Sequence, residues 1–254
     1  QKSLGGTSSD NAYSIKQTKD GGYIIAGSST SNNGDVSGNH GKDDCWVIKV
    51  NSVEIIEWQK SLGGSARDLT TSIQQTLDGG YIIAGSTTSN DGDVSGNHGI
   101  FDGWVIKINS LGVIEWQKCF GGTGSDQLQY IQQTKDGGYI VAGQSFSNNG
   151  DVSGNHGKAD FWVIKINNNG IIEWQNSFGG TETDYASSIQ QTVDGGYIIS
   201  GSSNSNDGNV SGNKGDYDSW VLKLSINGVI EWEKSLGGSG AEYANSNQQN
   251  ADGG

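Results

Sequence analysis

The chain has 254 residues, with 42 glycines, no proline, no methionine and a formal net charge of −13. Its eight tryptophans and nine tyrosines exclude a disordered chain, because disordered segments are poor in aromatic residues. The negative charge disfavours nucleic acid and anionic membrane surfaces as partners, and no run of 18 apolar residues is present that would insert as a transmembrane helix.

A gapless repeat of 58 residues organises the chain as a single repeat domain, 1–254. Trp58, Trp116, Trp174 and Trp232 mark the same position in successive copies. The complete copies are 1–58, 59–116, 117–174 and 175–232, and a partial fifth copy covers 233–254. Because no copy needs an insertion to align with the others, each copy is expected to contact its neighbours in the same way.

The first copy contains four apolar segments, which predict short strands at residues 13–18, 23–28, 45–50 and 55–60. Residues 19–22, which read Lys-Asp-Gly-Gly, predict a tight hairpin turn, because glycine accepts positive φ. The third and fourth strands are joined by a second short turn, in which Glu54 replaces the glycine of the other copies, so we expect a looser turn there. No segment shows the apolar period of a helix.

The second and third strands of each copy are apolar on both faces, so the sheet must be covered on both sides. Radial stacking of four-stranded sheets achieves this. We therefore expect an all-β fold, a β-propeller built from 58-residue four-stranded antiparallel blades. The fourth strand mixes in charged residues and suits an outer edge. The alternative architecture is an open β-solenoid or a superhelical stack of the same units.

Three sequence patterns recur in the copies: Asp-x-Trp-Val-Ile-Lys-Ile, then Gly-x-Ile-Glu-Trp-Gln-Lys-Ser-Leu-Gly-Gly, then Ile-Gln-Gln-Thr-x-Asp-Gly-Gly-Tyr-Ile-Ile-Ala-Gly. Together they resemble the SBBP-type β-propeller repeat of secreted bacterial proteins, over all the copies. The resemblance implies export and an extracellular or cell-surface location. It implies no catalytic residues.

The two longer connections of each copy, 29–44 and 61–71 in the first, are expected at one end of the sheet, where loops on a rigid scaffold form the default binding surface. The loop at 31–41 is rich in Asn, Asp and Gly, and it recurs at 89–99 and 147–157. Its oxygens suggest calcium as a cofactor, and the candidate ligands are Asn33, Asp35, Asp91, Asp93, Asn149 and Asp151.

The alternative, which we favour, is that these side chains hydrogen-bond to nearby backbone and hold a long turn without metal. In the fourth copy Asn209 replaces the aspartate of the other copies, so a calcium site there is expected to bind worst.

Other conspicuous side chains are expected to be structural. His40 and its copies lack a second metal ligand at suitable spacing, so we expect a hydrogen bond to a backbone carbonyl instead of zinc. Asp44 and its copies precede a strand and are expected to accept backbone hydrogen bonds. Trp46 and Trp58, with their copies, are expected in the core rather than in sugar sites. Cys45 and Cys119 occupy different repeat positions and are expected to be free thiols.

Catalysis is not expected, because an active site needs a unique constellation of residues whereas a repeat gives every blade the same ones. The sequence contains no Gly-x-Ser-x-Gly, His-Glu-x-x-His or P-loop motif. We expect a non-enzymatic extracellular β-propeller that acts as a protein- or glycan-binding and adhesion scaffold. The alternatives are a lectin with one sugar site per blade and a non-catalytic propeller part of a larger exported hydrolase.

The two ends of the chain fall inside expected structural elements. Gln1 aligns with Gln59 in the fourth strand, and Gly254 falls within a hairpin turn. Half-made blades leave unpaired edges that seek partners. We therefore expect either a piece of a larger ring or self-association through incomplete terminal blades, with residues 233–254 near the N-terminus of the same or another chain.

Overall fold

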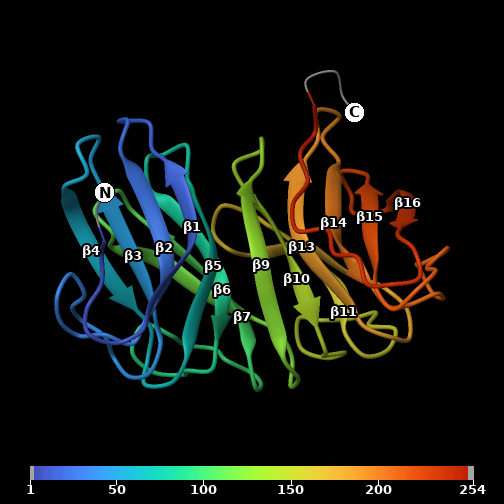
Figure 1. Ribbon diagram of the computed structural model, residues 1–254, viewed down its shortest axis with the longest axis horizontal. Helices are drawn as coiled ribbons and strands as arrows, with labels where there is room; N and C mark the ends of the chain where they lie inside the picture. Colours follow the sequence, from blue (N-terminus) through green and yellow to red (C-terminus); the bar gives the residue numbers. More distant parts are fainter. Residues whose placement is uncertain (1–2, 251–254) are drawn as a thin grey trace. The chain divides into compact units, whose positions relative to one another are not determined.

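A computed structural model describes residues 3–250, which form sixteen β-strands and no helix (Figure 1). The strands are β1 (Asp10–Gln17), β2 (Tyr23–Ser29), β3 (Asp44–Val50), β4 (Ile56–Leu62), β5 (Asp68–Gln75), β6 (Tyr81–Thr87), β7 (Asp102–Ile108), β8 (Ile114–Phe120), β9 (Asp126–Gln133), β10 (Tyr139–Ser145), β11 (Asp160–Ile166), β12 (Ile172–Phe178), β13 (Asp184–Gln191), β14 (Tyr197–Ser203), β15 (Asp218–Leu224) and β16 (Ile230–Leu236). Over the described residues, no helix is long and apolar enough to cross a membrane.

Each group of four consecutive strands forms one antiparallel sheet in chain order, and we call these sheets blades 1 to 4. The predicted fold class, an all-β array of four-stranded antiparallel blades of the propeller type, is confirmed. The fourth strand of each blade runs past the 58-residue boundary chosen from the sequence, since β4 ends at Leu62. The chain divides into two compact units, Gln1–Phe120 with blades 1 and 2, and Gly121–Gly254 with blades 3 and 4.

A β-bulge in the first strand of each blade explains one glycine of the repeat. In blade 1 the register with β2 shifts between Ala12 and Ser14. The bulge presses the backbone of the first strand against Gly27 of β2, so that an added Cβ would lie 1.8 Å from the carbonyl oxygen of Asn11. The equivalent glycines of the other blades face the same backbone at 1.8 to 2.0 Å. Only glycine fits at this position.

A nearly buried lysine ties the two hairpin turns of each blade together. In blade 1, Lys49 Nζ forms ion pairs with Asp20 at 2.9 Å and Glu57 at 2.8 Å, and it donates to the carbonyl of Val50 at 3.1 Å. Lys107, Lys165 and Lys223 make the equivalent pairs in the other blades. A buried ammonium is tolerated because its charge is paired and its hydrogens are bonded.

The turn between β3 and β4 is not looser than its copies, although it contains Glu54. Glu54 adopts a left-handed φ of 63°, close to the 75° of Gly112 in blade 2. The two turns form the same hydrogen bonds, with Glu54 N donating to Asn51 O and Gly112 N donating to Asn109 O, both at 3.1 Å. The tight turn is therefore kept at the cost of backbone strain in a non-glycine residue.

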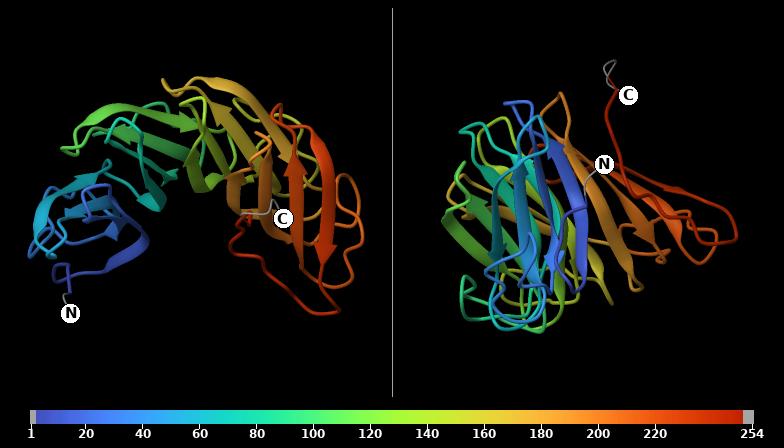
Figure 2. Two further views of the ribbon diagram at one scale, coloured as in Figure 1. Left: turned by 90° about the horizontal axis from the view of Figure 1, so that it is seen from above. Right: turned by 60° about the vertical axis from the view of Figure 1, so that its left-hand side comes forward.

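Within each unit, the core lies between the faces of successive sheets (Figure 2). In the first unit, Ile73, Tyr81 and Trp104 of blade 2 are buried in one cluster with β2 and β3 of blade 1. Trp58 of blade 1 packs edge-on against Tyr81, with ring centroids 5.9 Å apart. In the second unit, Trp174 and Tyr197 repeat this contact at 5.8 Å. Such aromatic pairs add about 0.5–1.5 kcal/mol beyond the area that they bury.

The residues after β16 lie against blade 4 in extended form without belonging to a sheet. Gln249 N donates to Gln190 Oε1 at 3.0 Å, which repeats the bond from Gln191 N to Gln132 Oε1 between blades 3 and 4. Residues 241–250 thus occupy the place that the first strand of a following blade would take. Gln1 and Gly254, which the sequence analysis places inside structural elements, lie outside the described residues.

Candidate functional site

The Asn/Asp/Gly loops and the Gly-Gly loops meet at one end of each blade, as predicted. The six candidate calcium ligands share one role, because each accepts a hydrogen bond from the backbone of the loop before the first strand of its own blade. The bonds are Thr7 N to Asn33 Oδ1 (2.9 Å), Gly5 N to Asp35 Oδ2 (3.1 Å), Ser65 N to Asp91 Oδ1 (2.8 Å), Gly63 N to Asp93 Oδ2 (3.2 Å), Thr123 N to Asn149 Oδ1 (2.9 Å) and Gly121 N to Asp151 Oδ2 (3.2 Å).

The fourth copy shows what this loop position requires. Asn209, which stands where the other copies have aspartate, still accepts a bond from Gly179 N at 3.2 Å. The bond therefore survives the loss of the charge, which supports the backbone-bonding interpretation of these side chains. Within residues 3–250 no three His, Cys, Asp or Glu side chains come together as a metal-binding group. Calcium binding by these loops stays a prediction.

The loop histidine of the first three copies pairs with a buried aspartate. His40 Nδ1 lies 2.7 Å from Asp44 Oδ2, and the backbone N of His40 donates to the same oxygen at 2.9 Å. The predicted bond from His40 to a backbone carbonyl is therefore wrong, whereas the predicted backbone bond to Asp44 is confirmed. Burial raises the pKa of Asp44, although the bonds from His40 oppose this shift. The histidine edge that faces away from Asp44 remains partly exposed.

The repeated tryptophan of the third strand is structural, as predicted, whereas the repeated tryptophan of the fourth strand is not fully in the core: Trp58 is half-buried and Trp232 is 49% exposed. Trp46 is 5% exposed and its indole Nε1 donates to Gln59 Oε1 at 2.9 Å. The same bond joins Trp104 to Gln117 and Trp162 to Gln175. Cys45 and Cys119 are also buried, and both are free thiols.

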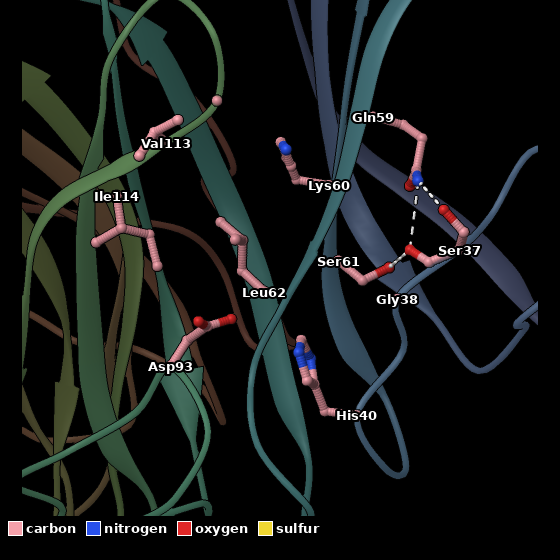
Figure 3. A pocket seen from close by; sticks show the side chains of 11 residues that line it. Ser37, Gly38, His40, Gln59, Lys60, Ser61, Leu62, Asp93, Val113 and Ile114 are labelled. Atoms are coloured by element: carbon pink, nitrogen blue, oxygen red, sulfur yellow. Dashed lines mark hydrogen bonds between the residues drawn. The ribbon is translucent and has the colours of Figure 1, made fainter.

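A groove of about 540 Å³ lies between blades 1 and 2, beside the His40 loop (Figure 3). One wall is the last strand of blade 1, which contributes Lys60, Ser61 and Leu62. The other wall comes from blade 2, with Asp93 on its loop and Val113 immediately before β8. In Figure 3, Lys60 extends toward Val113, and His40 and Asp93 lie on opposite sides of the space. Its volume falls within the range of small-molecule sites, and its lining is more polar than is usual for them.

A second groove of about 500 Å³ occurs at the same repeat positions in blade 4. Ser211, Gly212 and Lys214 stand 174 residues after Ser37, Gly38 and His40, which is three repeats. The last strand contributes equivalent residues, from Glu233 to Leu236. The groove is therefore a product of the repeat rather than of one chance packing defect.

Sequence reasoning missed the groove because it treated the fourth strand only as a protected edge. A signal was nevertheless present in the copies. Lys60 and Asp93 correspond to Asn176 and Asn209, so both charges are absent together at the later junction. These two positions, on a strand and on the following blade's loop, thus differ in the same copy, and the structure places both in the lining of the groove.

Comparison with protein-family models finds no match, and comparison with curated proteins finds none either. Among solved structures, a protein of unknown function from Bacteroides caccae is 13% identical, covers 89% of this chain and 82% of its own, and has a TM-score of 0.36. A mannose phosphorylase from Leishmania mexicana, in complex with phosphate ion, is 13% identical, covers 96% of this chain and 78% of its own, and has a TM-score of 0.39. These likenesses carry no argument about function.

Proposed function

We propose that the protein is a non-enzymatic binding module that holds a glycan in the grooves between its blades. The observation that supports this most directly is the recurrence of one groove at the same repeat positions in blades 1 and 4. Both grooves combine hydroxyl and charged groups with a leucine of the last strand, and the first adds the amide of Gln59 and an apolar wall at Val113 and Ile114. Sugars present hydroxyl groups at their edges and C–H groups on their faces, so such a lining is complementary to them.

A non-catalytic role fits the way in which the groove's polar groups are used. Gln59 Nε2 donates to Ser37 Oγ at 2.6 Å, and Ser61 Oγ donates to the carbonyl of Ser37 at 3.1 Å (Figure 3). These bonds hold the loop against the last strand and leave neither hydroxyl activated by a base. An extracellular or cell-surface location belongs to the same proposal and rests on the resemblance of the repeat to a secreted family.

A glycan array tests this function, probed once with calcium and once with a chelator. We expect binding to saccharides in both conditions. Val113→Arg places a bulky side chain on the wall of the first groove and should weaken the signals, with the blade 4 groove left intact, whereas Leu77→Arg adds the same charge at an exposed turn outside both grooves and should preserve them in full. The absence of any saccharide signal, or equal loss in both variants, contradicts the proposal. A stoichiometry of one ligand per blade would favour the lectin alternative.

Self-association is a second candidate role, favoured by the face of blade 1. Ile15 is 59% exposed and Tyr23 is 38% exposed, whereas their equivalents in blade 2, Ile73 and Tyr81, are 0% and 2% exposed. We propose that this face packs on a second copy of the chain as blade 2 packs on blade 1. Light scattering of the 254-residue chain should then show an oligomer, and Ile15→Lys should disrupt it. A monomer at high protein concentration contradicts this role.

A further inference from the structure

Most polar side chains of the groove between blades 1 and 2 already have partners within the protein. Gln59 accepts from Trp46 Nε1 and donates to Ser37, and Ser61 donates to Ser37. A ligand cannot compete for these groups without breaking the contacts that hold the loop. Ligand recognition must therefore come from the remaining polar groups of the lining.

Two charged groups of the lining remain available. Within residues 3–250, the side chain of Lys60 has no ion pair or hydrogen bond, and its ammonium extends into the groove (Figure 3). Asp93 uses Oδ2 to accept a weak bond of 3.2 Å from Gly63 N, which leaves Oδ1 for other donors. Lys60 and Asp93 line opposite walls and do not pair with each other. Two opposite charges that share a groove without touching are complementary to a ligand that bridges them.

The junction between blades 3 and 4 lacks both of these charges. There Asn176 stands at the position of Lys60 and Asn209 at the position of Asp93, while the wall residues corresponding to Val113 and Ile114 are unchanged as Val229 and Ile230. Asn176 Nδ2 donates to the carbonyl of Gly228 at 3.1 Å, so its amide is already hydrogen-bonded to the neighbouring blade. Asn209 keeps the loop bond that Asp93 makes, so the fold does not require the charge at this position, and the charges of Lys60 and Asp93 are available to serve a ligand.

We infer that the groove between blades 1 and 2 selects a saccharide unit that carries a carboxylate, such as a uronic acid. Lys60 binds the carboxylate by a charge-assisted hydrogen bond, Asp93 accepts hydrogen bonds from the sugar hydroxyls, and Leu62, Val113 and Ile114 contact the C–H face of the ring. The net charge of −13 opposes densely charged polyanions, so the ligand has one or two carboxylates rather than many. This inference rests on the proposed glycan-binding function and adds the ligand class.

The test compares digalacturonic acid with its methyl ester, which has the same ring and hydroxyl groups without the charges, by titration calorimetry on the full chain. We expect the acid to bind about tenfold or more tightly than the ester, as one charge-assisted bond implies. Lys60→Asn and Asp93→Asn copy the residues of the later junction and should fold. Lys60→Asn should remove the preference for the acid, and Asp93→Asn should weaken both ligands.

Lys16→Asn is the matched control, because it removes one positive charge from exposed β1, away from the groove. It should leave the preference intact. Equal binding of acid and ester, or an equal effect of Lys60→Asn and Lys16→Asn, overturns the inference while the glycan-binding function stands. The absence of binding for the acid, the ester and every saccharide of the array overturns both.

Discussion

The strained turn at Glu54 offers a direct test of the backbone geometry. A left-handed conformation costs a non-glycine residue about 1–2 kcal/mol, a strain that glycine avoids. Glycine instead stabilises the unfolded chain through its extra backbone freedom, and this offsets about 0.5–1 kcal/mol of the gain. Glu54→Gly should therefore raise the free energy of unfolding by about 0.5–1 kcal/mol. Urea unfolding at equal protein concentration measures this as a shift of the midpoint at an unchanged slope.

Two further variants separate the backbone from the side chain. Glu54→Ala removes the same side chain but keeps the strained φ, so it should give no gain. Gly112→Ala is the reverse experiment in blade 2, where φ is 75° and an added Cβ would lie 3.0 Å from the ring of Trp58. It should cost about 2 kcal/mol, since strain and crowding add. If Glu54→Ala stabilises as much as Glu54→Gly, the strain argument is refuted.

Three other predictions concern acid, thiol chemistry and metal. Burial raises the pKa of Asp78, but hydrogen bonds from Thr76 and Lys107 outweigh it and lower the pKa to about 2. The ionised carboxylate therefore stabilises the fold above about pH 4. In acid-unfolding curves, the difference in stability between wild type and Asp78→Asn should shrink as the pH falls toward about 2. Burial raises the pKa of Cys45 to about 12, so iodoacetamide should modify it only after denaturation, as mass spectrometry will show, and rapid native labelling contradicts this. Since Asp35 already accepts a backbone bond, a chelator should leave the melting temperature unchanged; a fall in wild type that Asp35→Asn abolishes would instead support the calcium interpretation.

The explicit turn chemistry places all four strands of the unit, although β1 begins at Asp10, three residues before its predicted start. The Lys-Asp-Gly-Gly segment places the first hairpin, and the strand after it begins at Tyr23 as predicted. The end of the fourth strand was misplaced, because its apolar signal fades after Trp58 while its pairing with β3 continues to Leu62. Pairing depends on the partner strand, which single-sequence patterns do not include.

The candidate site was harder to predict because it depends on contacts between blades. The partner of His40 is Asp44, only four residues away, yet the sequence does not show that a long loop folds back to bring the two together. The groove wall joins Lys60 to Val113 of the following blade, 53 positions later in the printed sequence. Nothing local to either residue reports that proximity. The one related signal in the sequence is that the fourth copy carries Asn176 and Asn209 at the positions of Lys60 and Asp93.

The extended segment at residues 241–250 bears on the order in which such a chain assembles during synthesis. It is held on blade 4 by bonds such as Gln249 N to Gln190 Oε1, although no sheet of its own supports it. We therefore expect a finished blade to serve as a template for the first strand of the next blade. Because the ribosome delivers the N-terminal blade first, assembly is expected to proceed blade by blade. Contacts between blades, such as that of Gln249 with Gln190, join residues about one repeat apart, which keeps the search for each junction short.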